Sequence, residues 1–342
     1  MSLQELLQQS HFPVIQAPMA GGLTSPAFIA AVCEAGALGS LGGGYLSPEN
    51  LRAQIQEVRK RTSRPYSVNL FSPTAVIVDE KKIDASRRWL LPYHQELNIK
   101  AEPVAVWDPD LFEKQFQVVL EEKVPVFSFA FGSLSVDKIK ALHAQKALVI
   151  GTATSLDEGR FLEAQGCDAV VAQGSEAGGH RGSFLKNEFP LVSLWDLLPA
   201  LTSHLRIPVI AAGGIVNHEQ ARRARSMGAA AVQVGTAFLV CKESSAPPSY
   251  KQKLLTSAKG STVLTKTFSG RWARGVNNRF MTEMKIHEND LPDYPLQNSL
   301  TQVLRRHAVE TGNTDFMSLW AGEGVGELQE RTLVELIGEL TR

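Results

Sequence analysis

Short apolar runs alternate with longer segments of helical pattern from about residue 14 to residue 240. Several of these runs are apolar throughout, as expected for strands of a parallel sheet that is covered on both faces. Eight such alternations favour a sheet closed into a (β/α)8 TIM barrel, in the α/β class, over an open sheet. The predicted strands are Val14–Ala17, Leu38–Leu41, Tyr66–Leu70, Val126–Phe129, Leu148–Gly151, Ala169–Ala172, Val209–Ala212 and Ala231–Val234.

The links between these strands carry signals for helix starts and stops. Ser25-Pro26 and Ser47-Pro48 each supply a capping hydroxyl and a proline for a first helical turn. The segment Ser155 to Glu158 is typical of a capping box, and Gly166 is expected to end that helix. Asn217 begins another helix by the same logic.

Two regions depart from the simple repeat. The link Ser72–Lys123 is too long for one helix, and we expect two helices around Ala101–Trp107. The chain becomes polar after Cys241, with a loop-like stretch at Ser269–Asn278 and a helical tail at Leu333–Leu340. We therefore expect a barrel domain over residues 1–240 and a mainly helical C-terminal extension over residues 241–342, packed on or over the barrel.

Composition narrows the function classes. The 342 residues are 44% hydrophobic, with 35 basic and 35 acidic side chains, and they form no basic stripe for a nucleic acid. The cysteines at 33, 167 and 241 are too dispersed for a metal site or a disulfide framework, which suits a reducing cytoplasm. No apolar run is long enough to span a membrane, and residues 1–12 do not have the pattern of a signal peptide.

Glycines and polar residues cluster where the predicted strands end, which is the functional end of a barrel of this kind. Gly213-Gly214 and Gly235-Thr236 follow the last two strands, where backbone N–H groups can approach a phosphate. The alternative is that both are tight turns without a ligand, but their joint position in these two strands favours phosphate binding.

A second candidate is the loop from Gly178 to Gly182, in which three glycines surround His180 and Arg181. This composition disfavours a helix or strand and favours close approach to a ligand. An isolated histidine is usually a surface or satisfied core residue, yet its place at a strand end favours a functional role. Arg181 could pair with Glu176 or with an acidic ligand, and the sequence leaves both open.

The glycines between Leu38 and Tyr45 do not have the G-x-G-x-x-G spacing of a dinucleotide site, and the following helix begins later, at Ser47-Pro48. We therefore expect no dinucleotide there.

Four segments together resemble the nitronate monooxygenase family. They run from Gln16 to Gly22, from Gly174 to Gly182, from Ile207 to Ile215, and from Gln233 to Thr236. The resemblance covers residues 13–240 well and continues more loosely through Gly270–Gly275 and Trp320–Gly326. It implies a TIM barrel with non-covalent FMN, which oxidises alkyl nitronates, notably propionate 3-nitronate, with O2 to a carbonyl compound plus nitrite or nitrate.

The resemblance also implies a set of site residues. His180 matches the histidine beside the flavin, Asn69 and Gln173 would face its ring and ribityl chain, and Gly214 with Gly235-Thr236 would surround its phosphate. The partners implied are a small-molecule substrate and O2, with a monomer or homodimer as the assembly. The full set expected to contact the cofactor is Pro18, Met19, Asn69, Gln173, Gly178, Gly179, Gly213, Gly214, Gln233, Val234, Gly235 and Thr236.

Three rival functions remain open. An FMN-dependent enoyl-acyl-carrier-protein reductase resembles this family in its barrel and in a related Gly-Gly-His loop, and an NAD(P)H:quinone reductase could use the same scaffold. Arg181 after His180 favours the monooxygenase. A non-catalytic barrel that binds a phosphate ligand would leave Asn69, Gln173 and His180 unexplained.

Overall fold

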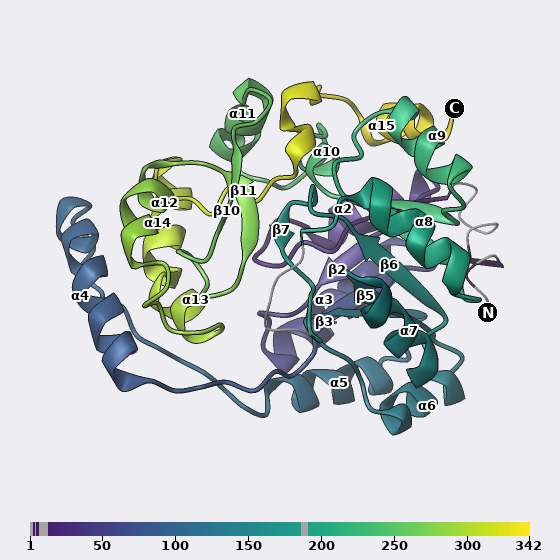
Figure 1. Cartoon of the computed structure of the whole chain (residues 1–342), viewed down its shortest axis with the longest axis horizontal. Coiled ribbons are helices and arrows are strands. Elements are labelled where there is room, and N and C mark those ends of the chain that lie inside the picture. The colour runs from purple at the N-terminus through teal and green to yellow at the C-terminus, as the bar shows by residue number, and fades with distance from the viewer. Residues whose placement is uncertain (1–2, 4, 7–12, 186–190) are drawn as a thin grey trace.

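A barrel of eight parallel strands forms the centre of the protein (Figure 1). The structure is a computed structural model and describes residues 3, 5–6, 13–185 and 191–342. The prediction about a signal peptide concerns residues 1–12, most of which lie outside the described residues. All eight predicted strands are confirmed, with ends that differ by at most two residues. They are β1 (Val14–Gln16), β2 (Ser40–Gly42), β3 (Ser67–Phe71), β4 (Val126–Ala130), β5 (Leu148–Ala153), β6 (Ala169–Gln173), β8 (Val209–Ala212) and β9 (Ala231–Val234).

The barrel closes beside β1. Within the sheet the strand order is β1-β9-β8-β6-β5-β4-β3-β2, which leaves β1 and β2 at the two ends. Leu38, just before β2, joins them: its N–H donates to the carbonyl of Val14 at 3.0 Å, and its carbonyl accepts from the N–H of Gln16 at 2.9 Å. Leu38, predicted as part of the strand itself, thus makes an isolated bridge, and the strand begins two residues later.

Helices cover the outside of the barrel, and the predicted caps begin them. The Ser25 hydroxyl accepts from the N–H of Phe28, and the Ser47 hydroxyl accepts from that of Asn50. Gly166 ends its helix in the left-handed conformation, as predicted. The helices are α2 (Pro26–Glu34), α3 (Pro48–Arg61), α4 (Glu80–Glu96), α5 (Leu111–Glu121), α6 (Val136–Ala144), α7 (Leu156–Gln165), α8 (Leu194–His204), α9 (His218–Ser226) and α10 (Thr236–Leu239).

The capping box predicted at Ser155 is only half formed. Its hydroxyl accepts from the N–H of Glu158 as expected. The Glu158 carboxylate, however, is buried and turns to the N–H and hydroxyl of Thr154, at 2.7 and 2.8 Å, and to the N–H of Phe184 at 2.6 Å. The carboxylate therefore anchors the chain just after the histidine loop instead of closing the cap.

The remaining chain builds a second layer beside the barrel. Its first helix is α4, one of the two helices predicted in the long link, which leaves the barrel and lies next to α12 and α14 (Figure 1). Leu90 and Tyr93 of α4 belong to the same apolar cluster as Phe268, Phe280 and other residues of the extension. The division at residue 240 stays a prediction. The elements of this part are α11 (Pro248–Thr256), β10 (Thr262–Thr265), β11 (Ala273–Val276), α12 (Arg279–Met284), a 3-10 turn (Lys285–His287), α13 (Leu296–Leu300), α14 (Gln302–Thr311), a second 3-10 turn (Glu323–Glu327) and α15 (Leu333–Thr341).

The prediction of a loop at Ser269–Asn278 is wrong for its centre. Ala273–Val276 is the strand β11, which pairs antiparallel with β10 and also with the short strand β7 (Gly179–His180). Its sequence, Ala-Arg-Gly-Val, has no alternating pattern, and two of its residues also pair with a segment far away in the chain. Sequence pattern alone therefore carries little signal for it.

The C-terminal helix returns to the barrel, where α15 packs on α9, α10 and β1. Its apolar face, including Leu336 and Leu340, joins the cluster between strands and helices. No helix in the described part of the chain is both long and apolar enough to cross a membrane.

Candidate functional site

Polar side chains line the inside of the barrel at the ends of its strands. Val126 and Val171 point inward, whereas Val68, Phe127 and Val170 pack outward against the helices. Because strand side chains alternate, the same period turns polar residues of several strands inward at their carboxyl ends. These residues are Asn69, Ser128, Thr152, Gln173 and Gln233.

This polar layer is partly cross-linked. Asn69 Nδ2 donates to the hydroxyl of Ser128 at 2.9 Å, and the Thr152 hydroxyl donates to the carbonyl of Phe129 at 3.0 Å. Sequence reasoning found Asn69, Gln173 and Gln233 but missed Ser128 and Thr152. Both could have been predicted, because each lies two residues after an inward-facing residue of its strand.

Two glycine turns present backbone donors at the ends of β8 and β9. Gly213 and Gly214 adopt positive φ angles of 135° and 68°, which disfavour any other residue. Gly235 precedes the first turn of α10, which starts at Thr236. Among the described residues, none of these four backbone N–H groups has a hydrogen-bond acceptor. The turns therefore form a group of unpaired donors of the kind that binds phosphate.

The segment after β1 lies between these turns and β2. The Cβ of Ala17 is 3.6 Å from the position that a Cβ on Gly235 would take. A Cβ on Gly42 would come within 2.6 Å of the backbone of Met19 and Ala20. Pro18 and Met19 thus pass across the ends of β9 and β2, as the site prediction requires. Val234 turns its side chain into the outer apolar cluster, so only its backbone faces the site.

The histidine loop is held between the barrel and the extension. Gln173 spans it from the barrel side, donating from Nε2 to the carbonyl of His180 at 3.0 Å and accepting at Oε1 from the N–H of Gly182 at 2.8 Å. From the other side, β7 pairs with β11, with His180 opposite Ala273. Gly178 leaves no space for a side chain, since a Cβ there would lie 2.5 Å from the backbone of Ala321 and Gly322.

Arg181 points away from the histidine and into the protein. Its side chain is buried, and its guanidinium donates to the carbonyls of Gln173 and Gly174 at the end of β6. Glu176 instead accepts from the N–H of Leu194 at 2.8 Å. Burial, and then the charge of Arg274, lower the pKa of Arg181 to about 10. These hydrogen bonds attach the histidine loop to the end of β6.

Three aromatic rings surround His180. The ring centroids of Trp320, Phe131 and Tyr294 lie 5.4, 5.6 and 6.0 Å from that of His180. These side chains come from three separate parts of the chain, and sequence reasoning missed all of them. Their only sequence signal is their aromatic character, which is equally typical of core residues.

The hydrogen bonds of Ser269 assign the tautomer of His180. Nε2 of His180 lies 2.8 Å from Ser269 Oγ, and the same hydroxyl donates to the carbonyl of Arg271 at 3.0 Å. Because a hydroxyl has one proton, Ser269 Oγ accepts from His180, and the imidazole proton is on Nε2. The Nδ1 lone pair of His180 has no partner among the described residues, so it is the basic atom.

Positive charge surrounds this imidazole. Burial, followed by the charges of Arg271 and Arg305, lowers the pKa of His180 to about 3. The ring centroids of Tyr45 and Tyr294 lie 6.5 Å apart, the same two arginines act on both side chains, and burial raises the pKa of both tyrosines. The charged groups that act on His180 are therefore all cationic, and the histidine is neutral at ordinary pH.

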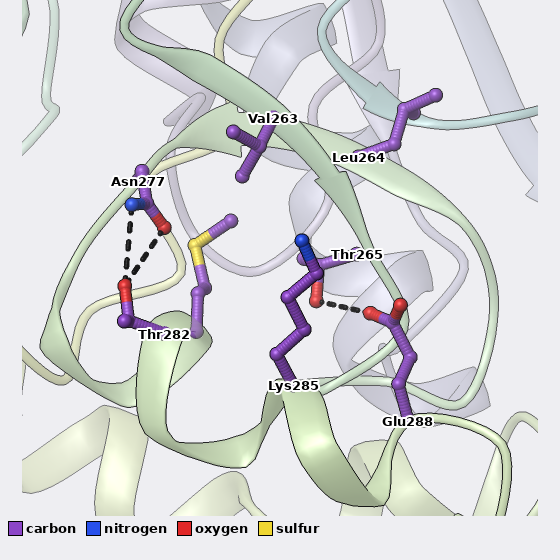
Figure 2. Close-up of a pocket in the computed structure, with 8 residues that line it drawn as sticks. Val263, Leu264, Thr265, Asn277, Thr282, Lys285 and Glu288 are labelled. Carbon is purple, nitrogen blue, oxygen red and sulfur yellow. Dashed lines mark hydrogen bonds between the residues drawn. The ribbon is translucent and has the colours of Figure 1, made fainter.

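A separate hollow lies in the extension, between the β10–β11 hairpin and α12 (Figure 2). Thr265 donates to Glu288 at 2.9 Å on one side of it, and Asn277 donates to Thr282 at 3.2 Å on the other. None of the predicted site residues lines it, so it is distinct from the barrel site.

Within the described ranges, no group of histidine, cysteine or acidic side chains could hold a metal ion. The three cysteines are buried free thiols, and burial raises the pKa of each, to about 11 for Cys33 and about 12 for the other two. They therefore lack the thiolate character that metal binding requires.

Comparisons with known proteins point to one family. The family model described as nitronate monooxygenase matches residues 4–342. A protein of Staphylococcus aureus (strain Newman) named probable nitronate monooxygenase is 41% identical over 314 residues, which cover 91% of this chain and 88% of that protein.

Two solved structures are also similar to this chain over nearly its whole length. A nitroalkane oxidase from Streptomyces ansochromogenes has a TM-score of 0.90 and 35% identity, covering 98% of this chain and 96% of that one. FabK from Thermotoga maritima has a TM-score of 0.77 and 29% identity, covering 99% and 94%.

The charge around His180 leads to a spectroscopic prediction. Because its pKa is lowered, the neutral form persists as the pH falls, and we expect His180 to stay neutral, with the proton on Nε2, from about pH 8 to about pH 5. Imidazole 15N NMR of the purified protein measures both properties, and the His180→Asn spectrum identifies the signal. A titration midpoint near about 6.5, or a proton on Nδ1, would contradict this account.

Proposed function

The chain belongs to the nitronate monooxygenase family, and on that basis we propose that it binds FMN and uses O2 to oxidise alkyl nitronates, including propionate 3-nitronate, to a carbonyl compound plus nitrite or nitrate. As a member of that family it is an oxidoreductase that acts on nitronates. The observation that carries the finer proposal is the position of His180, which stands over a polar barrel end beside a set of unpaired backbone donors.

The barrel end fits a flavin mononucleotide. The N–H groups of Gly213, Gly214, Gly235 and Thr236 lack acceptors among the described residues, and they would hold the phosphate. Asn69, Gln173 and Gln233 face inward at the ends of β3, β6 and β9 and would contact the ring and ribityl chain. Gly178 and Gly179 at the loop, with Pro18, Met19 and the backbone of Val234, complete the set that we propose. When bound, the flavin supplies the redox chemistry, accepting electrons from the nitronate and returning them to O2.

His180 orients the substrate and can accept a proton from it. A nitronate is already an anion, so no proton has to leave carbon before oxidation. With the proton held on Nε2 by Ser269, the free lone pair on Nδ1 can accept the α-proton of a neutral nitroalkane. A bound anion beside the ring raises the pKa of the imidazole, which favours donation to the nitronate oxygens in that complex.

The first prediction concerns the cofactor. We expect the purified protein to be yellow and to release FMN, not FAD, on denaturation. Gly214→Asp should lose the flavin, because the new carboxylate would meet Glu176, whose Cβ lies 3.1 Å from the added Cβ, and would repel the phosphate. Chromatography of the released flavin measures both. Stoichiometric FAD, full occupancy in Gly214→Asp, or a colourless protein with no flavin absorbance would each contradict the assignment, and the last would favour a non-catalytic binding barrel.

A second prediction separates the monooxygenase from a reductase. We expect oxygen consumption with propionate 3-nitronate to need no NAD(P)H, and we expect NADH or NADPH to reduce the flavin slowly in the absence of oxygen. An oxygen electrode and an anaerobic absorbance trace give the two rates. Turnover that appears only with a nicotinamide would support the enoyl-acyl-carrier-protein or quinone reductase alternative.

The third prediction concerns His180. His180→Asn keeps a small hydrogen-bonding side chain but removes the base. We expect FMN to stay bound, nitronate turnover to fall moderately, and any nitroalkane turnover to fall by about 10²–10⁴-fold. The exposed His204 on α8 provides the matched control, and His204→Asn should change neither rate. Equal losses for the two substrates would show that His180 acts in binding alone.

A further inference from the structure

Two arginines lie near His180 with part of each guanidinium free of hydrogen bonds within the described residues. Arg271 donates from Nε to the carbonyl of Arg181 at 3.1 Å and from Nη2 to that of Ser183 at 2.5 Å, and its Cζ lies 4.1 Å from the centre of the Phe131 ring. Its Nη1 has no hydrogen-bond partner among the described residues. The backbone carbonyls therefore fix the guanidinium and leave one edge open.

Arg305 on α14 is held in the same way. Its Nε donates to the Thr301 hydroxyl at 3.1 Å, and its Nη2 donates to the carbonyl and side-chain oxygens of Asn298 at 2.7 and 2.9 Å. Its Nη1 also lacks a partner in the described part of the chain. Thr301 in turn donates to the carbonyl of Phe268, whose ring neighbours that of Trp320 beside His180. The charge of Arg305 acts on His180 as that of Arg271 does.

No described carboxylate pairs with either charge. The groups that favour the charged form of Arg305 are the hydroxyls of Tyr45 and Tyr294, which burial keeps protonated. The charge of Glu158 also favours the charged form of Arg271. The Glu158 carboxylate, however, already accepts hydrogen bonds from the N–H groups of Thr154 and Phe184. Burial of both guanidinium groups lowers their pKa, to about 10 for Arg271. Cations that are partly withdrawn from water and lack an acidic partner are costly, so these two guanidinium groups favour an anionic ligand.

We propose that Arg271 and Arg305 bind the carboxylate of a short nitronate that carries a second negative charge, while its nitronate group lies at His180. The inference rests on the proposed function and adds the residues that set substrate preference. Guanidinium N–H groups match carboxylate oxygens in geometry and charge. Neutral-tailed nitronates leave both Nη1 groups unpaired, so the site discriminates against them.

Two substrates of similar size test the proposal. Propionate 3-nitronate carries the carboxylate, and propyl-1-nitronate replaces it with a methyl group. In the wild-type holoenzyme we expect a higher kcat/KM for propionate 3-nitronate. In Arg305→Met and Arg271→Met we expect that value to fall roughly 10- to 100-fold, mainly through KM, because each variant removes a hydrogen bond to a charged group. The value for propyl-1-nitronate should fall much less, because only the effect of these charges on His180 is lost for that substrate, so the ratio of the two values should drop.

Arg306 provides the control, because it is the next residue in α14 and its side chain is largely exposed. Arg306→Met should change neither value, and Arg305→Lys should keep part of the preference because it keeps the charge. Equal losses on the two substrates, or no loss on either, would overturn the assignment of the arginines. If the wild type oxidised neither nitronate, the proposed function would fail; if it oxidised both without preference, only this inference would.

A binding measurement covers the case in which the arginine variants do not fold. Succinate and butyrate, which the enzyme cannot oxidise as nitronates, are titrated into the wild-type holoenzyme, and the flavin spectrum reports binding. We expect succinate to bind at least about tenfold more tightly, with an affinity that falls as salt is added. Equal affinities for the two carboxylates would count against a second anion site.

Discussion

The pairing of β7 with β11 is the contact on which the site depends. Gly179–His180 follows a barrel strand, and Ala273–Val276 belongs to the extension, so this short ladder joins the two layers at the open end of the barrel. Gln173 holds the same loop from below through both atoms of its amide. Because the loop is bound from both sides, His180 has a defined direction that a free glycine-rich loop would not provide.

The extension also determines the electrostatics of His180. Ser269, Arg271 and Arg305 all come from it, and together they orient the imidazole, keep it neutral and surround it with positive charge. A neutral histidine among cations is an arrangement suited to anionic ligands, since the site attracts the anion without first having to protonate the ring. The aromatic rings of Phe131, Tyr294 and Trp320 pack around the same imidazole, and apolar surroundings strengthen charge interactions.

The strand ends of β8 and β9 and the surroundings of His180 differ in the groups that they offer to a ligand. At β8 and β9, unpaired backbone N–H groups beside glycines suit a phosphate, whose recognition needs many short donors and no side chain. Around His180, by contrast, we propose that side chains provide the selectivity, because carboxylate and nitronate groups differ in shape and in proton demand. Arg181, the residue that set the histidine loop apart in the sequence, serves neither end and instead binds the carbonyls that close β6.

The sequence by itself determined the barrel and the part of the site that belongs to it. The eight strands and their capped helices follow from period, glycine placement and strand ends, which are local properties of the chain, and the same strand ends place Gly213, Gly214 and His180; the resemblance to a family added the roles that we propose for Asn69 and Gln173. Only the tertiary structure decided what faces His180. Phe131, Ser269, Arg271, Tyr294, Arg305 and Trp320 come together through long-range packing, and β11 forms because a distant segment pairs with it. Local pattern cannot encode such contacts, since their energy appears only once both partners are in place.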